Sequence, residues 1–127
     1  MTLQWAIPQL LETSKSQAYN PAFLLTCGLL YRDPSPILFS LGVGKAAQHN
    51  LLHNFHKKYE PKIHVAVVPV GGFVSDDAKV TSARNVAEEF WKLYGQQKGS
   101  QGKFSVEMED PDYLPMLEGL IKQVEGN

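Results

Sequence analysis

The sequence predicts an α/β fold: a partial Rossmann-like arrangement in which a three-stranded parallel sheet carries helices on both faces, with one further helix at the C-terminus. Three short apolar runs, at about 22–26, 63–68 and 104–108, alternate with stretches of helical periodicity. The first two runs are almost unbroken, which is typical of strands covered on both faces. Strands joined by helices of this length run parallel and are linked by right-handed crossovers.

The helices are expected from apolar residues that recur every three or four positions. Pro8 is expected to kink or locally open the first of them, and Pro61 to end the second. The pair Gly71-Gly72 after the second strand predicts a turn that side chains would obstruct. The expected helices cover residues 3–16, 37–59, 82–94 and 111–124.

Composition predicts one ordinary domain spanning residues 1–127. With 12 basic and 13 acidic residues, the chain lacks the basic excess that nucleic acid or an anionic membrane surface would require. No apolar run approaches the roughly 20 residues of a membrane-spanning helix. The start of the chain does not read as a signal peptide, and the single Cys27 cannot close an intrachain disulfide. A cytoplasmic, reducing setting is therefore expected.

Three segments, taken in order, resemble the short-chain dehydrogenase/reductase family, and its fungal members in particular. They are the run Phe23–Gly28, the helix that carries Lys45-Ala46-Ala47, and the run His64–Gly72. In that family a strand ends at an active-site serine, a helix carries Tyr-x-x-x-Lys, and the next strand enters a Pro-Gly turn. Gln4 and Pro8 also match the family's helix before the serine strand. The resemblance covers residues 1–109 and leaves 110–127 as a C-terminal helical extension.

The departures from the family pattern matter for function. The position of the family's tyrosine holds Leu41, which has no proton to give or take. The glycine-rich nucleotide turn and the active-site asparagine of the family would both precede Met1. The cluster Gly42-Val43-Gly44 lies inside a helix and is interpreted as a site of close helix packing. The resemblance thus implies a truncated protein, the C-terminal half only, without a nicotinamide cofactor or NAD(P)-dependent redox activity.

Three residues are candidates for chemistry. Lys45, retained from the family pattern, would orient an anionic or enolic oxygen, or else be an idle inheritance. Tyr31, in the loop after the first strand, could supply the proton that Leu41 cannot, as could Asp33 in the same loop; alternatively, Tyr31 only packs over the loop beside a capping Asp33. Cys27 could be a nucleophile whose thiolate Lys45 stabilises, or else a buried inert thiol. The residues expected to surround a bound substrate are Thr26, Phe39, Leu41, Gly72 and Phe73.

Three histidines, His49, His53 and His56, have helical spacing that suggests a metal site. They would need a carboxylate to complete the ligand set, and the spacing places none beside them. They are therefore interpreted as solvated or interface histidines, and no metal is expected.

The expected edge at 22–26 is apolar and unprotected, so something must cover it. The C-terminal helix, a second copy or a longer protein could each do so. In the resembled family the two helices at 3–16 and 36–59 form a dimer interface, and a homodimer is predicted. Three functional hypotheses stay open. The first is a cofactor-independent isomerase, cyclase or lyase acting on a small organic molecule. The second is a non-catalytic pseudoenzyme that binds a ligand, dimerises or associates with a full-length relative, and the third is a fragment with no separate role.

Overall fold

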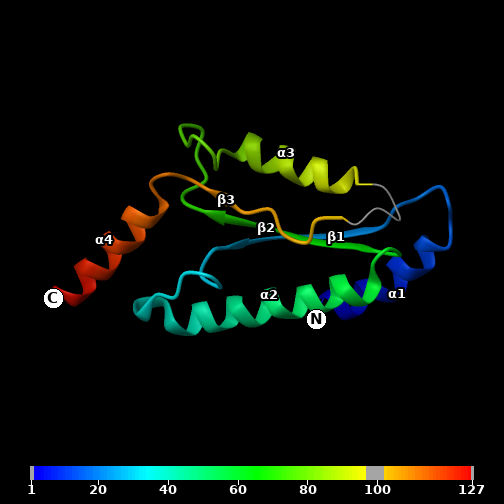
Figure 1. Cartoon of the computed structure of the whole chain (residues 1–127), viewed down its shortest axis with the longest axis horizontal. Coiled ribbons are helices and arrows are strands. Elements are labelled where there is room, and N and C mark those ends of the chain that lie inside the picture. Colours follow the sequence, from blue (N-terminus) through cyan, green and yellow to red (C-terminus); the bar gives the residue numbers. More distant parts are fainter. Residues whose placement is uncertain (1, 97–101, 127) are drawn as a thin grey trace.

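The computed structural model describes residues 2–96 and 102–126 and confirms the predicted fold class. Within these residues a three-stranded parallel sheet is accompanied by four α-helices, an arrangement consistent with a partial Rossmann-like fold (Figure 1). A short 3₁₀ turn at Pro36–Leu38 precedes the second helix. The elements are α1 (Thr2–Ser14), β1 (Ala22–Gly28), α2 (Phe39–Tyr59), β2 (His64–Gly71), α3 (Ala83–Tyr94), β3 (Met108–Glu109) and α4 (Tyr113–Glu125).

The strand order is β1-β2-β3, so β2 is central. β1 pairs with β2 along its whole length, from Ala22 opposite His64 to Gly28 opposite Val70. The predicted strand at 104–108 follows β2 in two pieces: a single bridge at Ser105, and the two-residue β3. The third strand therefore runs where the sequence predicts it but is joined to the sheet by a much shorter ladder than β1.

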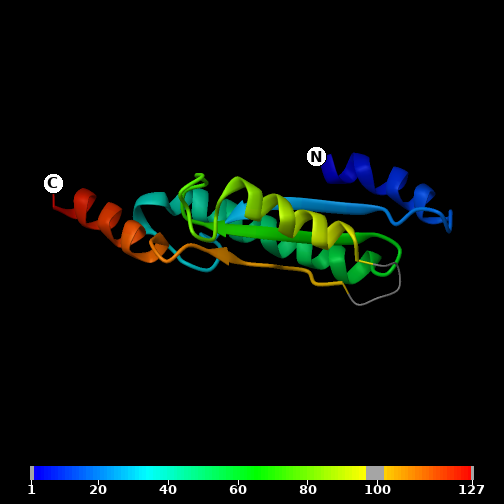
Figure 2. The ribbon, with the colours of Figure 1, turned by 90° about the horizontal axis from the view of Figure 1, so that it is seen from above.

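β2 separates two apolar layers. Because successive side chains of a strand point to opposite faces, Val65 and Val67 pack with α1 and α2, whereas Ala66 and Val68 pack with α3. All four are fully buried. The views in Figures 1 and 2 agree that α2 and α3 lie on opposite faces of the sheet. The apolar character of β2 thus follows from its being covered on both sides.

The turn after β2 requires glycine at one position. Gly72 has a φ of 123°, in the left-handed region where a Cβ is strained, and a Cβ there would approach the Cβ of Asp110 to 3.0 Å. A Cβ on Gly71 would come within 2.3 Å of the Leu29 side chain. The expectation of a turn that side chains would obstruct is confirmed. Pro8, expected to disturb the first helix, lies inside α1, which continues past it to Ser14.

α4 packs at the end of the sheet rather than along its edge. Tyr113 and Leu117 form a small cluster with Leu29, and the rest of α4 projects beyond the strand ends (Figures 1 and 2). On the side away from β2, β1 pairs with no strand in the described part of the chain. The C-terminal helix α4, one of the three candidates for covering this edge of β1, therefore does not cover it. No helix among residues 2–96 and 102–126 is long and apolar enough to cross a membrane.

The burial of α3 generates a stability prediction. Leu93 is 1% exposed, whereas Trp91, two residues earlier on the same helix, is 73% exposed. We expect Leu93→Ala to lower the free energy of unfolding by about 2–5 kcal/mol, because the substitution leaves a cavity inside a packed apolar layer. Trp91→Ala removes a larger side chain but should cost less than about 1 kcal/mol. Urea denaturation followed by far-ultraviolet circular dichroism measures both, and equal losses would contradict the assigned packing.

Candidate functional site

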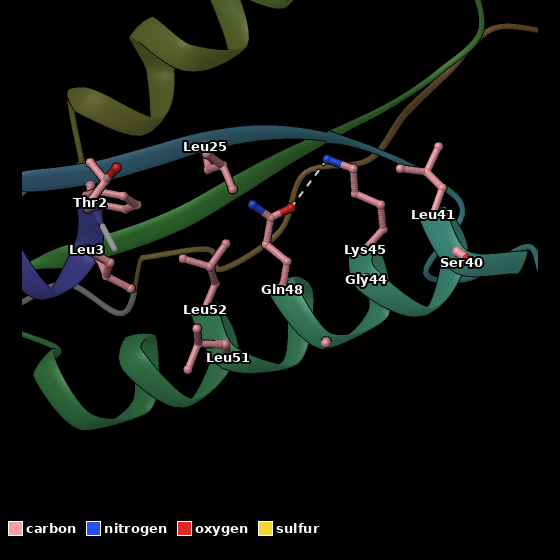
Figure 3. A pocket seen from close by; sticks show the side chains of 12 residues that line it. Thr2, Leu3, Leu25, Ser40, Leu41, Gly44, Lys45, Gln48, Leu51 and Leu52 are labelled. Atoms are coloured by element: carbon pink, nitrogen blue, oxygen red, sulfur yellow. Dashed lines mark hydrogen bonds between the residues drawn. The ribbon is translucent and has the colours of Figure 1, made fainter. Parts of the chain in front are cut away.

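An open groove of about 710 Å³ lies between β1, α2 and the start of α1 (Figure 3). Among the described residues that line it, Lys45 alone carries a charge. The Lys45 ammonium donates to the Oε1 of Gln48, 3.5 Å away and one turn further along α2. The apolar part of the lining includes Leu3, Phe23, Leu25, Leu41, Leu51 and Leu52. The groove is thus an apolar trough with a single cation in its wall.

The sequence of α2 explains why the groove exists. Leu41, Lys45, Gln48 and Leu52 recur at helical spacing and form one stripe that faces the groove (Figure 3). Gly44, in the same stretch, leaves room that a side chain would occupy, since a Cβ there would meet no atom within 4 Å. The interpretation of the glycine cluster as close helix packing is therefore wrong at Gly44, where the missing side chain leaves open space, and at Gly42 a Cβ would make only an ordinary contact, 3.9 Å from the Leu30 carbonyl oxygen.

Cys27 lies at the end of β1 on the face turned toward α2. The alternation along the strand places it with Phe23 and Leu25. Partial burial raises the pKa of the thiol, the charge of Glu107 raises it further, and the charge of Lys45 opposes both with a smaller effect than burial. At neutral pH the side chain is therefore a thiol, the weaker form for nucleophilic attack.

Thr26 points to the opposite face. Leu24, which shares its face of β1, packs in the layer covered by α3. The Thr26 hydroxyl donates to the Val68 carbonyl oxygen at 3.3 Å. The structure therefore separates Thr26 from the groove that contains Lys45.

Tyr31 is held in place by partners that the sequence did not reveal. Its hydroxyl donates to the Glu107 carboxylate, and its ring stacks on His49 with centroids 3.9 Å apart. Burial and the bond to Glu107 both raise the pKa of the phenol, which therefore stays protonated at neutral pH. Arg32 holds the same loop against the β3 side of the sheet. It forms ion pairs of 2.8 Å with Glu107, just before β3, and with Glu109, in β3. No local signal joins Tyr31 and Arg32 to Glu107 and Glu109, because 75 or more positions separate them in the chain.

The remaining predicted site residues are spread over the molecule. Leu41 lines the groove, but Phe39 is 72% exposed at the start of α2 and is not part of the groove lining. Gly72 and Phe73 border a separate hollow of about 360 Å³, next to Asp110 and α4. The structure brings Lys45 and Leu41 together, sets Cys27 within reach of the Lys45 charge, and leaves Thr26, Phe39, Gly72 and Phe73 apart.

A second polar cluster joins the end of α2 to the start of β2. One carboxylate oxygen of Glu60 lies 2.7 Å from Nδ1 of His64 and 3.6 Å from Nδ1 of His56. Sequence reasoning missed this cluster because it grouped His56 with the histidines before it. The signal that could have found it is the spacing His-x₃-Glu-x₃-His, which includes the turn at Pro61. The rings of His49, His53 and His56 all contact the ring of Phe104.

Comparison with known proteins adds no relative: no family model, curated protein or solved structure matches the chain. The class defined by fold and site is therefore an α/β domain with a mostly apolar groove and one cation in it.

The environment of Cys27 generates a prediction for its reactivity. Glu107→Gln removes a negative charge that raises the thiol pKa, so the pH midpoint of iodoacetamide alkylation should fall. Lys45→Gln removes a positive charge that lowers this pKa, and the midpoint should rise. Glu109→Gln is the matched control, because Glu109 also pairs with Arg32 but does not act on the thiol. Midpoints that move together in all three variants would contradict this account.

Proposed function

We propose that the protein binds a small organic molecule in the groove between β1 and α2, and that Lys45 holds an anionic or enolic oxygen of that molecule. The observation that supports this proposal is the position of Lys45 as the one charged side chain in the described lining. An apolar trough with a few placed polar groups is the usual form of a small-molecule site. The volume of about 710 Å³ lies within the range of such sites.

Lys45 and Gln48 define the polar end of the proposed ligand. Within the described part of the chain, the half-buried ammonium makes one long hydrogen bond, of 3.5 Å, to a neutral amide oxygen. A ligand carboxylate or enolate oxygen would offer a stronger, charge-assisted bond. The leucine-lined remainder of the groove suits a hydrocarbon or aromatic body, whose burial supplies most of the binding free energy. The ligand class is therefore an apolar molecule with one acidic or enolic oxygen.

Catalysis is the second candidate, as a cofactor-independent isomerase, cyclase or lyase. Apart from Lys45, the described lining offers no carboxylate, imidazole, thiol or phenol to move a proton. What favours the catalytic version is that two proton-bearing groups lie close by: the Cys27 thiol, which feels the charge of Lys45, and the Tyr31 phenol. Binding needs only the groove itself, so it is the function that we put first.

We further propose that this function needs no nicotinamide. If the resemblance to short-chain dehydrogenases reflects descent, the proton donor of the family has been replaced by Leu41, whose aliphatic side chain is part of the groove wall. The proposed setting is the cytoplasm, where a free thiol such as Cys27 stays reduced.

A matched pair of fluorescent probes tests the binding proposal. The anion 1-anilino-8-naphthalenesulfonate and the neutral N-phenyl-1-naphthylamine share one ring system and differ in the sulfonate. We expect Lys45→Gln to weaken binding of the anion about five- to tenfold, the equivalent of about 1 kcal/mol, and to leave the neutral probe unchanged. Leu41→Asp should weaken both, because it places a charge in the apolar wall.

Leu120→Asp is the control for this experiment. Leu120 is 40% exposed on α4, away from the groove, so the variant should bind both probes as the unchanged protein does. Equal loss of the two probes in Lys45→Gln would remove Lys45 from the proposal. Unchanged binding in Leu41→Asp would show that the probes occupy another surface.

We also propose a homodimer formed through α1 and α2. Both helices leave apolar side chains in solvent: Trp5 is 70% exposed, Val43 57% and Leu41 51%. A second copy packed on these helices would bury that surface symmetrically. It would also close the open side of the groove, to which Leu41 contributes.

The dimer proposal is tested with a pair of tryptophans. Trp5→Asp should turn a sedimenting dimer into a monomer at micromolar concentration, because it places a charge in the proposed interface. Trp91→Asp, at a similarly exposed position on α3, should leave the dimer intact. A monomeric unchanged protein, or equal dissociation in both variants, would contradict an interface formed by α1 and α2.

A further inference from the structure

The cluster of His56, Glu60 and His64 brings three metal-ligating side chains to one point. Each residue offers one ligand atom, and the three atoms lie within 4.8 Å of one another. His56 is in the last turn of α2, Glu60 is the C-cap residue of that helix, and His64 is the first residue of β2. The short turn between helix and strand therefore assembles the cluster from one continuous segment.

We propose that His56, Glu60 and His64 bind a divalent zinc-class cation. Two imidazoles and one carboxylate form a ligand set that zinc accepts, with a fourth position left for water or another ligand. Ligand atoms about 2.1 Å from a tetrahedral ion lie about 3.4 Å apart. The observed limit of 4.8 Å is wider than this, so side-chain rotations would have to draw the three donor atoms closer together around the ion.

The burial of the cluster supports a bound ion. The exposed fractions of the three side chains are 16% for His56, 19% for Glu60 and 11% for His64, so their attraction for a cation is only partly screened by water. The Lys57, Lys58 and Lys62 side chains nearby are exposed, and the solvent around them screens their repulsion. The site is also reachable, since none of the three ligands is fully enclosed.

Two features of the imidazoles point the same way. Nδ1 of His56 lies 2.8 Å from the Val65 carbonyl oxygen; this contact engages Nδ1 and orients the ring, so Nε2 is the nitrogen of His56 that is left to bind a metal. Nε2 of His64 is buried and has no hydrogen-bond partner among the described residues. An ion pair between Glu60 and the histidines accounts for only one nitrogen of His64, and a buried nitrogen without a partner is costly.

The proposed metal site is independent of the groove. His56 follows Lys45 by 11 residues on α2, which places the two about 16 Å apart along the helix axis. Loss of ligand binding in the groove and loss of metal binding at Glu60 are therefore separate outcomes. A bound ion would tie the end of α2 to the start of β2.

The test uses the full chain prepared without a polyhistidine tag and stripped with a chelator. Zn²⁺ is titrated in competition with a fluorescent zinc indicator. We expect one Zn²⁺ per chain, and a loss of affinity of at least about tenfold in Glu60→Gln and in His64→Gln, because each variant removes a ligand. His53→Gln is the matched control: it lies one turn before His56, stacks on Phe104, and should change the affinity less than about twofold.

A spectroscopic measurement keeps the proposal falsifiable if a variant folds poorly. Zinc should shift the imidazole ¹⁵N resonances of His56 and His64 in the unchanged protein and leave those of His49 and His53 in place. Absence of stoichiometric binding overturns the proposal. So does equal weakening by His53→Gln and Glu60→Gln, or a zinc-induced shift of all four histidines.

Discussion

The structure depends on the burial of β2 on both of its faces. Val65, Val67, Ala66 and Val68 leave no exposed surface, and each neighbouring helix packs against one side of this strand. The apolar area removed from water here is the main source of stability for a chain of this length. Because β2 cannot shift by one residue without reversing its side chains, it also sets the register of β1 and the height at which α2 crosses the sheet.

The groove follows from that constraint. α2 must present Leu52 to the layer beside β2, and helical periodicity then directs Lys45 and Gln48 toward the edge of β1. No strand of the described chain lies beyond that edge, so the space is roofed only in part. Helix geometry alone therefore accounts for the position of Lys45 in the groove, whether or not a ligand binds there.

The sequence predicted the elements well because each one carries a local signal. Apolar runs marked β1 and β2, and helical periodicity marked α3, where the Ser82 hydroxyl caps the helix by accepting from the backbone N–H of Asn85 at 3.2 Å. The shortness of β3 was not visible, since Phe104, Val106 and Met108 alternate as a full strand would. Where the chain leaves the ladder is decided by its contacts with Val67 and Val70 on β2, which no local pattern records.

The site was predicted less completely, for a physical reason. Residues near strand ends were grouped as if all faced one cavity, but the alternation of β1 turns Thr26 away from Cys27. The partners of Tyr31, namely His49 and Glu107, come from α2 and from the segment before β3. Such contacts depend on how the layers stack. Of the predicted site residues, Lys45 and Leu41 lie in the groove lining; both belong to one helical stripe of α2, and both were chosen from the resemblance to the family pattern.

Because β3 is attached to the sheet by few pairs, the outer segment that contains it can open separately from the β1–β2 pair. β1 and β2 share seven paired positions, whereas β3 and the segment before it hold β2 through a two-residue ladder and one bridge. We therefore expect amide protons of this outer segment, and the Val67 amide that donates to Phe104, to exchange through local opening, and the β2 amides that pair with β1 to exchange only through global unfolding. Each such opening would carry Glu107 away and release the Tyr31 hydroxyl. The negative charge that acts on the Cys27 thiol would then depend on whether this outer segment is attached to the sheet.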